Sequence, residues 1–348
     1  MKMKFLKFIL FALTILGFVM YYNNIKHQNQ VISGETMNTY YQISIRSPHE
    51  NTLLKNQIKN ELQQINAEMS AFDPMSDLSL FNRNTDNGWI DVPVNLSYVL
   101  KEAYKIYNQT NGYFDPSIGK LIDIWGFGSN KVQKLPTDEE VKAAKQLVGL
   151  NKIEFNKDFR QAKKRNSDIT INLSAIAKGY AVDRIVSMLE KLGYTDFIVD
   201  IGGEVYAKGS RSKKDSGWNV GVARPDDNQV DNYEYIVKLK DTAVATSGDY
   251  RNYFYVDDKR YSHTIDPKTG YPVEHNLASV TVFDKSCMKA DALATGIMSM
   301  GEEKGLAFAN NNRLSVIMFV RTDAGFRPIV SNEAKKLLEK QQEKVNAK

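Results

Sequence analysis

Short strand-like runs, clustered between helical patterns and separated by polar turns, constrain the fold of this chain more than any other sequence feature. Strands joined by short turns pair antiparallel, whereas a doubly wound parallel sheet needs a crossover helix between strands. The clusters therefore favour the α+β class over a doubly wound sheet. The runs expected to contribute strands are 40–46, 151–156, 168–173, 196–209, 218–223, 234–240, 250–256, 276–283 and 313–321.

Helical patterns occupy the stretches between these clusters. Thr137 follows Pro136 and is placed as the N-cap of a helix in "LPTDEEVKAAKQLVG". The other expected helices are an amphipathic one over 52–68, one over 96–109, one after Ser174, one from near Lys289 and a charged one over 332–348.

The helix expected after Ser174 has an unusual beginning. Ser174 is placed as its N-cap, and Gly193 follows the last apolar position as a stop signal. Lys178 opposes the positive end of the helix dipole, and Gly179 costs up to about 1 kcal/mol relative to alanine. A close backbone approach to an anion such as a pyrophosphate explains both residues.

The N-terminus predicts export or membrane attachment. Lysines precede an apolar run over 8–22, which has the pattern of a signal-peptide core or a short membrane anchor. No small-x-small cleavage pattern follows Met20, so an uncleaved anchor is favoured over a cleaved signal. The expected segments are a signal peptide or anchor (1–22), a linker (23–33), one globular domain (34–331) and a charged C-terminal helix or tail (332–348).

The charge of the chain argues against nucleic-acid binding, and its cysteine content excludes a disulfide and a Cys-rich metal site. The net charge is +5, and three of those charges are Lys2, Lys4 and Lys7. The remainder is nearly balanced, so nucleic-acid binding has no electrostatic support. The single cysteine, Cys287, excludes an internal disulfide and a Cys-rich metal site, and it is expected to be a buried, inert thiol.

A metal site, if present, must use oxygen ligands. The chain has no H-E-x-x-H or C-x-x-C motif and neither of the common glycine-rich phosphate loops. Oxygen ligands favour magnesium or calcium. Asp291 and Thr295 lie four residues apart in "KADALATGIMSM", on one face of the expected helix, and can both point at one cation. Alternatively, Asp291 is a favourable first-turn charge and Thr295 a packing residue.

Three other segments have a functional and a structural interpretation. The aromatic residues of "GYFDPSIGKLIDIWGFG", 112–128, could enclose a planar ring or form a small core under a loop. The glycines of "DIGGEV", 200–205, predict a bulge or a close backbone contact. His263, in "DKRYSHTIDPKTGYPV", is functional only if other site residues lie beside it.

Taken together, these segments resemble the ApbE family, the FAD:protein FMN transferases. The resemblance runs from about Gly34 to near Arg321. It implies an ApbE-like, T-fold-related α+β fold with mixed, largely antiparallel sheets and packed helices. The blocks that carry it also include "GETMNTYYQI", "MSAFDPMSDLSLFN", "LSAIAKGYAVDR", "ATSGDYRNYF" and "ADALAT".

The resemblance implies an activity and its setting. Family members transfer the FMN half of FAD to a Thr or Ser hydroxyl of a target flavoprotein, forming a phosphoester and releasing AMP, with Mg²⁺ as cofactor. The expected acceptors are extracytoplasmic flavoprotein subunits, such as those of sodium-pumping NADH:quinone oxidoreductase or Rnf-type complexes. The expected location is the bacterial inner membrane, with the catalytic domain facing the periplasm.

The resemblance also implies roles for individual residues. Flavin or adenine contacts are implied for Met37, Phe72, Tyr113, Phe114, Asp115, Asn172 and Lys178. The implied magnesium ligands are the Ala175 carbonyl, Asp291 and Thr295. His263, Thr264 and Ile265 are expected to line the pyrophosphate. His263 is the preferred proton acceptor, with an aspartate or the metal as alternatives.

Two positions depart from the family pattern. Asn38 replaces a glycine, and asparagine tolerates a positive φ, so the turn is expected to survive. Asn172 replaces an acidic residue and keeps a carbonyl acceptor without the charge. Both could shift the balance from transfer to hydrolysis. The alternative functions are therefore a magnesium-dependent FAD pyrophosphatase and a non-catalytic flavin-binding protein.

Overall fold

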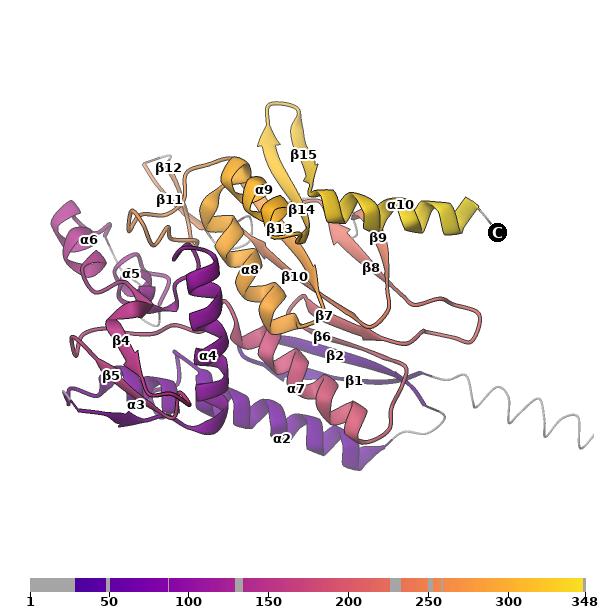
Figure 1. Ribbon diagram of the computed structural model, residues 1–348, viewed down its shortest axis with the longest axis horizontal. Coiled ribbons are helices and arrows are strands. Elements are labelled where there is room, and N and C mark those ends of the chain that lie inside the picture. The colour runs from indigo at the N-terminus through magenta and orange to yellow at the C-terminus, as the bar shows by residue number, and fades with distance from the viewer. Residues whose placement is uncertain are drawn as a thin grey trace, which may run out of the picture.

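An eight-stranded sheet forms the centre of the fold, with the strand order β1–β2–β6–β7–β10–β13–β14–β15 (Figure 1). The computed structural model describes residues 29–47, 51–86, 88–128, 134–225, 233–249, 253–257 and 259–346. Each neighbouring pair in the sheet is antiparallel, which confirms the expected α+β class with antiparallel sheets. The strands are β1 (Asn29–Thr36), β2 (Thr39–Arg46), β6 (Phe197–Ile201), β7 (Glu204–Lys208), β10 (Thr242–Gly248), β13 (Leu277–Asp284), β14 (Ser315–Thr322) and β15 (Gly325–Val330).

Helices α7 (Ala177–Lys191) and α8 (Cys287–Met300) cover one face of this sheet (Figure 1). Outside them pack α2 (Thr52–Met69) and α4 (Val94–Gln109). The main core lies between these layers, where side chains such as Val280 and Leu293 are fully buried. Burial of each such side chain contributes about 1.5–3 kcal/mol, which makes this interface the main source of stability.

The opposite face is covered over part of its width by a two-stranded sheet and the last helix. The sheet consists of β8 (Trp218–Ala223) and β9 (Tyr233–Leu239), and the helix is α10 (Asn332–Asn346). Trp218, Val237 and Phe319 pack into a second core there. The helix expected over 332–348 is thus present, and it packs against β14 and β9.

The other elements lie around this framework. They are α3 (Asp77–Arg83), β3 (Ile90–Asp91), η1 (Pro116–Ile118), α5 (Gly119–Ile124), α6 (Asp138–Lys145), η2 (Leu150–Lys152), β4 (Ile153–Phe155), β5 (Gln161–Lys164), β11 (Tyr253–Val256), β12 (Lys259–Ser262) and α9 (Glu302–Asn311). Thr137 caps α6 in a full capping box with Glu140, as its sequence predicts.

The prediction of a strand over 168–173 was wrong. A side chain takes the place of a neighbouring strand there, because Asn82 both donates to the Ile171 carbonyl and accepts from the Ile171 N–H, each at 2.8 Å. The strand of this region is β5 (Gln161–Lys164), which the sequence analysis missed.

Two predicted boundaries also differ. Strand β1 begins at Asn29, inside the predicted linker 23–33, because its backbone pairs with β2 from that residue onward. Helix α7 begins at Ala177, and its N-cap is Ile176 without a side-chain bond. Ser174 is therefore not the cap.

The predicted anchor, residues 1–22, lies outside the described residues. Among the helices that the structure does describe, none combines the length and apolar character needed to span a bilayer.

Candidate active site

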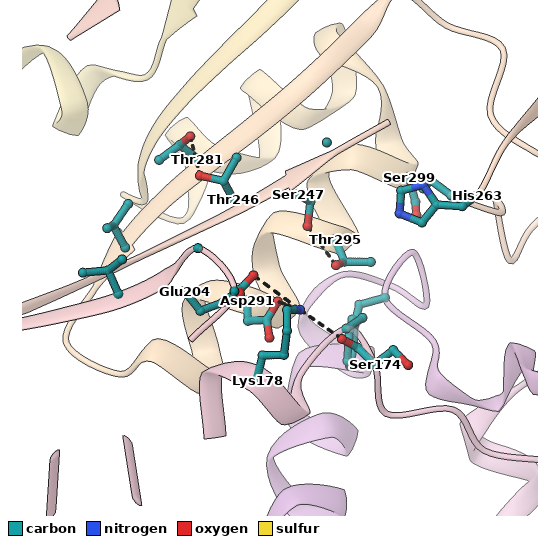
Figure 2. A pocket seen from close by; sticks show the side chains of 18 of the residues that line it. Ser174, Lys178, Glu204, Thr246, Ser247, His263, Thr281, Asp291, Thr295 and Ser299 are labelled. Carbon is teal, nitrogen blue, oxygen red and sulfur yellow. Dashed lines mark hydrogen bonds and ion pairs between the residues drawn. The ribbon is translucent and has the colours of Figure 1, made fainter. Parts of the chain in front are cut away.

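A cavity of about 780 Å³ opens between the sheet, the beginning of α7, one face of α8 and the segment that follows β12. This volume lies within the range of small-molecule and cofactor sites. Its walls carry hydroxyl, carboxylate, ammonium and imidazole groups from segments far apart in the sequence (Figure 2).

Lys178 occupies the centre of one wall. Its Nζ donates to the Ser174 carbonyl at 3.3 Å and lies 3.4 Å from Glu204 Oε1 and 3.8 Å from Asp291 Oδ1. Ser174 belongs to the turn before α7, Glu204 begins β7 and Asp291 lies in α8. Three separate elements therefore hold one ammonium group at the cavity wall.

Gly179 has a different role from the predicted one. A Cβ at this position would lie 2.4 Å from the Cys287 carbonyl oxygen and 2.7 Å from Met288 Cα, so the glycine allows α7 and α8 to pack closely. Its N–H donates to Asp291 Oδ2 at 3.0 Å. The close backbone approach expected from the sequence is thus to α8, and it fixes the Asp291 carboxylate.

Gly179→Ala is expected to lower the free energy of unfolding by about 1–3 kcal/mol, although alanine is the better helix former, because the methyl group overpacks the α7–α8 contact. Urea unfolding measures the change. Gly88→Ala is the control, since a Cβ added there would meet no other atom within 4 Å. Equal stabilities of Gly179→Ala and the parent protein would contradict the packing role.

The charges in this wall are not balanced. Burial raises the pKa of Glu204 to about 8, although Lys178 acts in the opposite direction. Burial likewise raises the pKa of Asp291, against Lys178 and the Gly179 N–H. Burial alone would lower the pKa of Lys178, but Asp291 and Glu204 outweigh it and raise that pKa. Two buried carboxyl groups thus share one ammonium, and Glu204 Oε2 is buried without a hydrogen-bond partner.

This wall fits a hard cation. Asp291 and Thr295 both line the cavity from consecutive turns of α8, as their spacing predicts, and Ala175 lines it from the turn before α7. All the available ligands there are oxygens, and a cation would neutralise the excess buried carboxylate. The Thr295 hydroxyl lies 3.0 Å from that of Ser247. Within the described residues, no group of three or more His, Cys, Asp or Glu side chains is arranged to hold a metal.

Glu204 makes the stability of the cation-free protein depend on pH. The pKa of the carboxyl is 4.5 without the fold and about 8 within it. Between these values the folded state binds more protons than the unfolded chain, so the free energy of unfolding falls as pH rises. Glu204→Gln is expected to reduce this slope, measured by urea unfolding at about pH 5 and about pH 8. Glu190→Gln, at a half-exposed position, is the control. An unchanged slope in Glu204→Gln would contradict the assignment.

His263, Thr264 and Ile265 line the opposite part of the cavity, directly after β12. Figure 2 shows His263 on the far side of Thr295 from Lys178. Phe127 contacts the His263 ring edge to face, with the ring centroids 6.3 Å apart. His263 therefore lines the cavity together with other site residues. This is the condition that the sequence analysis set for a functional role of this histidine.

Tyr113, Phe114 and Asp115 line the cavity from the loop after α4. Asp115 is buried and accepts hydrogen bonds from the Ser117 N–H and hydroxyl at 2.9 and 2.6 Å. Burial raises the pKa of Asp115 to about 6 despite these bonds. Asn172 also lines the cavity, and its Oδ1 accepts from the Ser174 N–H at 2.9 Å, so it uses the carbonyl that an acidic residue would also offer.

Met37 and Phe72 are the predicted site residues that do not line this cavity. Met37 lies with Asn38 in the two-residue turn between β1 and β2, with φ of 50° and 56°. The turn therefore survives with asparagine, as predicted. Phe72 lies in the turn after α2 and is 45% exposed.

The sequence analysis missed Glu204 and Ser247, which line the cavity from β7 and β10. Glu204 carried the clearer signal, since it is a carboxylate beside the apolar residues of a strand. The two glycines before it form the hairpin turn between β6 and β7, with φ of 64° and 98°. The pairing of these strands has no bulge, so that interpretation of "DIGGEV" was wrong. The close contact is present, because a Cβ at Gly202 would lie 2.8 Å from Thr39 Cγ2.

Comparisons with known proteins agree with this geometry. A sequence model described as the ApbE family matches residues 37–318. The FAD:protein FMN transferase of Vibrio cholerae is 39% identical over 313 residues, covering 89% of this chain and 92% of that protein. The FAD:protein FMN transferase of Haemophilus influenzae is 38% identical over 318 residues, covering 88% and 91%. The structure of the flavin transferase ApbE from Vibrio cholerae superposes with a TM-score of 0.81 at 37% identity, covering 89% of this chain and 99% of that one.

Proposed function

The chain belongs to the ApbE family, and from this premise we propose that it transfers the FMN half of FAD to a Thr or Ser hydroxyl of a flavoprotein. The acceptor oxygen forms a bond to the phosphorus of the FMN moiety, the pyrophosphate bond breaks, and AMP leaves. The names of the relatives support the transferase class.

One observation carries the proposal. A single cavity is lined by Lys178, by His263 and by oxygen groups of the kind that a hard cation prefers. Phosphoryl transfer needs these groups together, because the enzyme must position the phosphate, neutralise its charge and accept a proton from the attacking hydroxyl.

The chain's own residues have distinct roles in this scheme. Asp291, Thr295 and the Ala175 carbonyl would hold Mg²⁺, which would supply positive charge to the pyrophosphate oxygens. Lys178 adds a fixed positive charge beside the same phosphates. His263 accepts the proton of the acceptor hydroxyl, and Tyr113 offers an aromatic face to the flavin or adenine ring. Phe114 is buried in the main core and supports this loop from below.

We also propose the cellular setting implied by the sequence. The apolar N-terminal segment would tether the protein to the bacterial inner membrane, with the catalytic domain in the periplasm. The acceptors would be flavoprotein subunits on that side, such as those of sodium-pumping NADH:quinone oxidoreductase or Rnf-type complexes.

AMP release from FAD, with and without an acceptor flavoprotein, tests this function. The proposal predicts magnesium-dependent AMP release that requires the acceptor. AMP and free FMN released equally without acceptor would identify an FAD pyrophosphatase. FAD binding without AMP release would identify a flavin-binding protein.

A further inference from the structure

An ionic cluster around a buried carboxylate lies outside the cavity, and we call it the Asp249 clasp: Asp249, Arg260 and Arg321. Asp249 follows β10 and is 1% exposed. Arg260 of β12 donates to Asp249 Oδ2 at 2.8 Å and also to its backbone carbonyl. Arg321 of β14 donates to both carboxylate oxygens. None of these three described side chains lines the cavity, so the clasp acts on the site only indirectly.

Backbone hydrogen bonds hold two members of the clasp beside β13 of the central sheet. The Asp249 N–H donates to the Ala278 carbonyl of β13 at 3.0 Å, and the Arg321 N–H donates to the Asn276 carbonyl at 2.8 Å. The ion pair between Asp249 and Arg321 therefore joins parts of the chain that backbone hydrogen bonds already hold together.

Arg260 is placed differently. Its strand, β12, pairs with β11 in a separate two-stranded hairpin, outside the eight-stranded sheet. The Arg260–Asp249 pair thus ties this hairpin to the end of β10, whose residues Ser247 and Gly248 line the cavity.

Strand β12, which carries Arg260, immediately precedes the histidine of the site in the sequence. β12 ends at Ser262, and His263 follows. On the other side of the hairpin, Tyr261 stacks on Trp125 with ring centroids 5.8 Å apart, and Phe127 contacts His263. The aromatic contacts of Tyr261 and His263 and the ion pair of Arg260 therefore both restrain the start of the 263–265 segment.

We propose that Arg260 is a positioning residue. Through its ion pair with Asp249, it holds the His263 side chain at the position in the cavity that the chemical step requires. This inference rests on the proposed function, in which His263 accepts a proton. Catalytic geometry is narrow, since a displacement of about 1 Å can lower a rate by about 10²-fold. An ion pair that fixes the strand before the histidine therefore controls the rate without touching the substrate.

Arg260→Gln and Arg321→Gln form a matched pair of variants. Each removes one guanidinium from the same carboxylate and leaves the other to neutralise it, which avoids the uncompensated charges that a change of Asp249 would create. Arg260→Gln is expected to lower kcat for AMP release by about 10- to 100-fold, with an FAD dissociation constant within about threefold of the parent value. Arg321→Gln is expected to keep kcat within about threefold of the parent value. Its melting temperature is expected to fall by at least as much as that of Arg260→Gln. Arg260→Lys, which keeps the charge, is expected to restore most of the rate.

A double-mutant cycle separates positioning from a general loss of structure. In the His263→Ala background, Arg260→Gln is expected to cause no further loss of kcat, because its effect passes through the absent imidazole. Losses of kcat that multiply in the double variant, or equal losses in the two arginine variants, would overturn the proposal. Because AMP release is the readout, a parent enzyme that releases AMP without labelling an acceptor would refute the proposed transfer and still allow this comparison.

Discussion

Asp291→Ala is expected to abolish magnesium-dependent AMP release, lowering turnover by at least about 10³-fold, because the proposed magnesium site loses its carboxylate ligand. A cation bound at the proposed site would supply several kcal/mol of charge stabilisation. The alanine also leaves the Gly179 N–H without its acceptor. Asp291→Asn is therefore the sharper variant, since it keeps an oxygen for Gly179 and removes only the charge. Turnover measured against magnesium concentration gives the result for both.

Asp183→Asn is the matched control for this experiment. Asp183 is also a largely buried carboxylate beside α8, where it accepts from the Ser286 hydroxyl and the Cys287 and Met288 N–H groups, but it does not line the cavity. This variant is expected to lose stability and keep its magnesium dependence. Near-normal turnover in Asp291→Ala would exclude the proposed metal site.

His263→Ala is expected to reduce FMN transfer by about 10²- to 10⁴-fold, the usual contribution of a general base, while FAD still binds. The reason is its position after β12, facing the cavity from the side opposite Lys178. Flavin fluorescence measures binding, and single-turnover AMP release measures the chemical step.

His275→Gln is the control for this second variant. His275 lies outside the cavity, where its Nε2 is 2.8 Å from the Met298 carbonyl at the end of α8. It is expected to keep most of its activity. Loss of FAD binding in His263→Ala, in place of a slower chemical step, would make His263 a ligand contact and remove its assignment as the base.

The sequence predicted best those features that depend on neighbouring residues. The apolar run of "RLSVIMFVR" predicted a buried strand, and β14 is buried through most of its length. The spacing of Asp291 and Thr295 correctly placed both on one side of a helix. The positive φ at Asn38 followed from the conformational tolerance of asparagine.

Features that depend on distant residues were not predictable from local patterns. Residues 169–173 form no strand, because the backbone of Ile171 bonds the side chain of Asn82, which is 89 residues away, in place of a neighbouring strand. The sequence indicated that Gly179 makes a close approach, but the neighbour proved to be the backbone of α8. Glu204 was missed because nothing near it in the sequence shows that its strand meets Lys178.

The most direct test of the proposed function is a covalent label on an acceptor. The protein is incubated with FAD, Mg²⁺ and an acceptor flavoprotein, and the acceptor is then denatured and separated from free flavin. We predict flavin fluorescence that stays with the denatured acceptor, in an amount equal to the AMP released and absent with Asp291→Asn. AMP release with no fluorescence on any acceptor tested, including a second acceptor sequence, would contradict transfer and leave hydrolysis of FAD as the activity of this cavity.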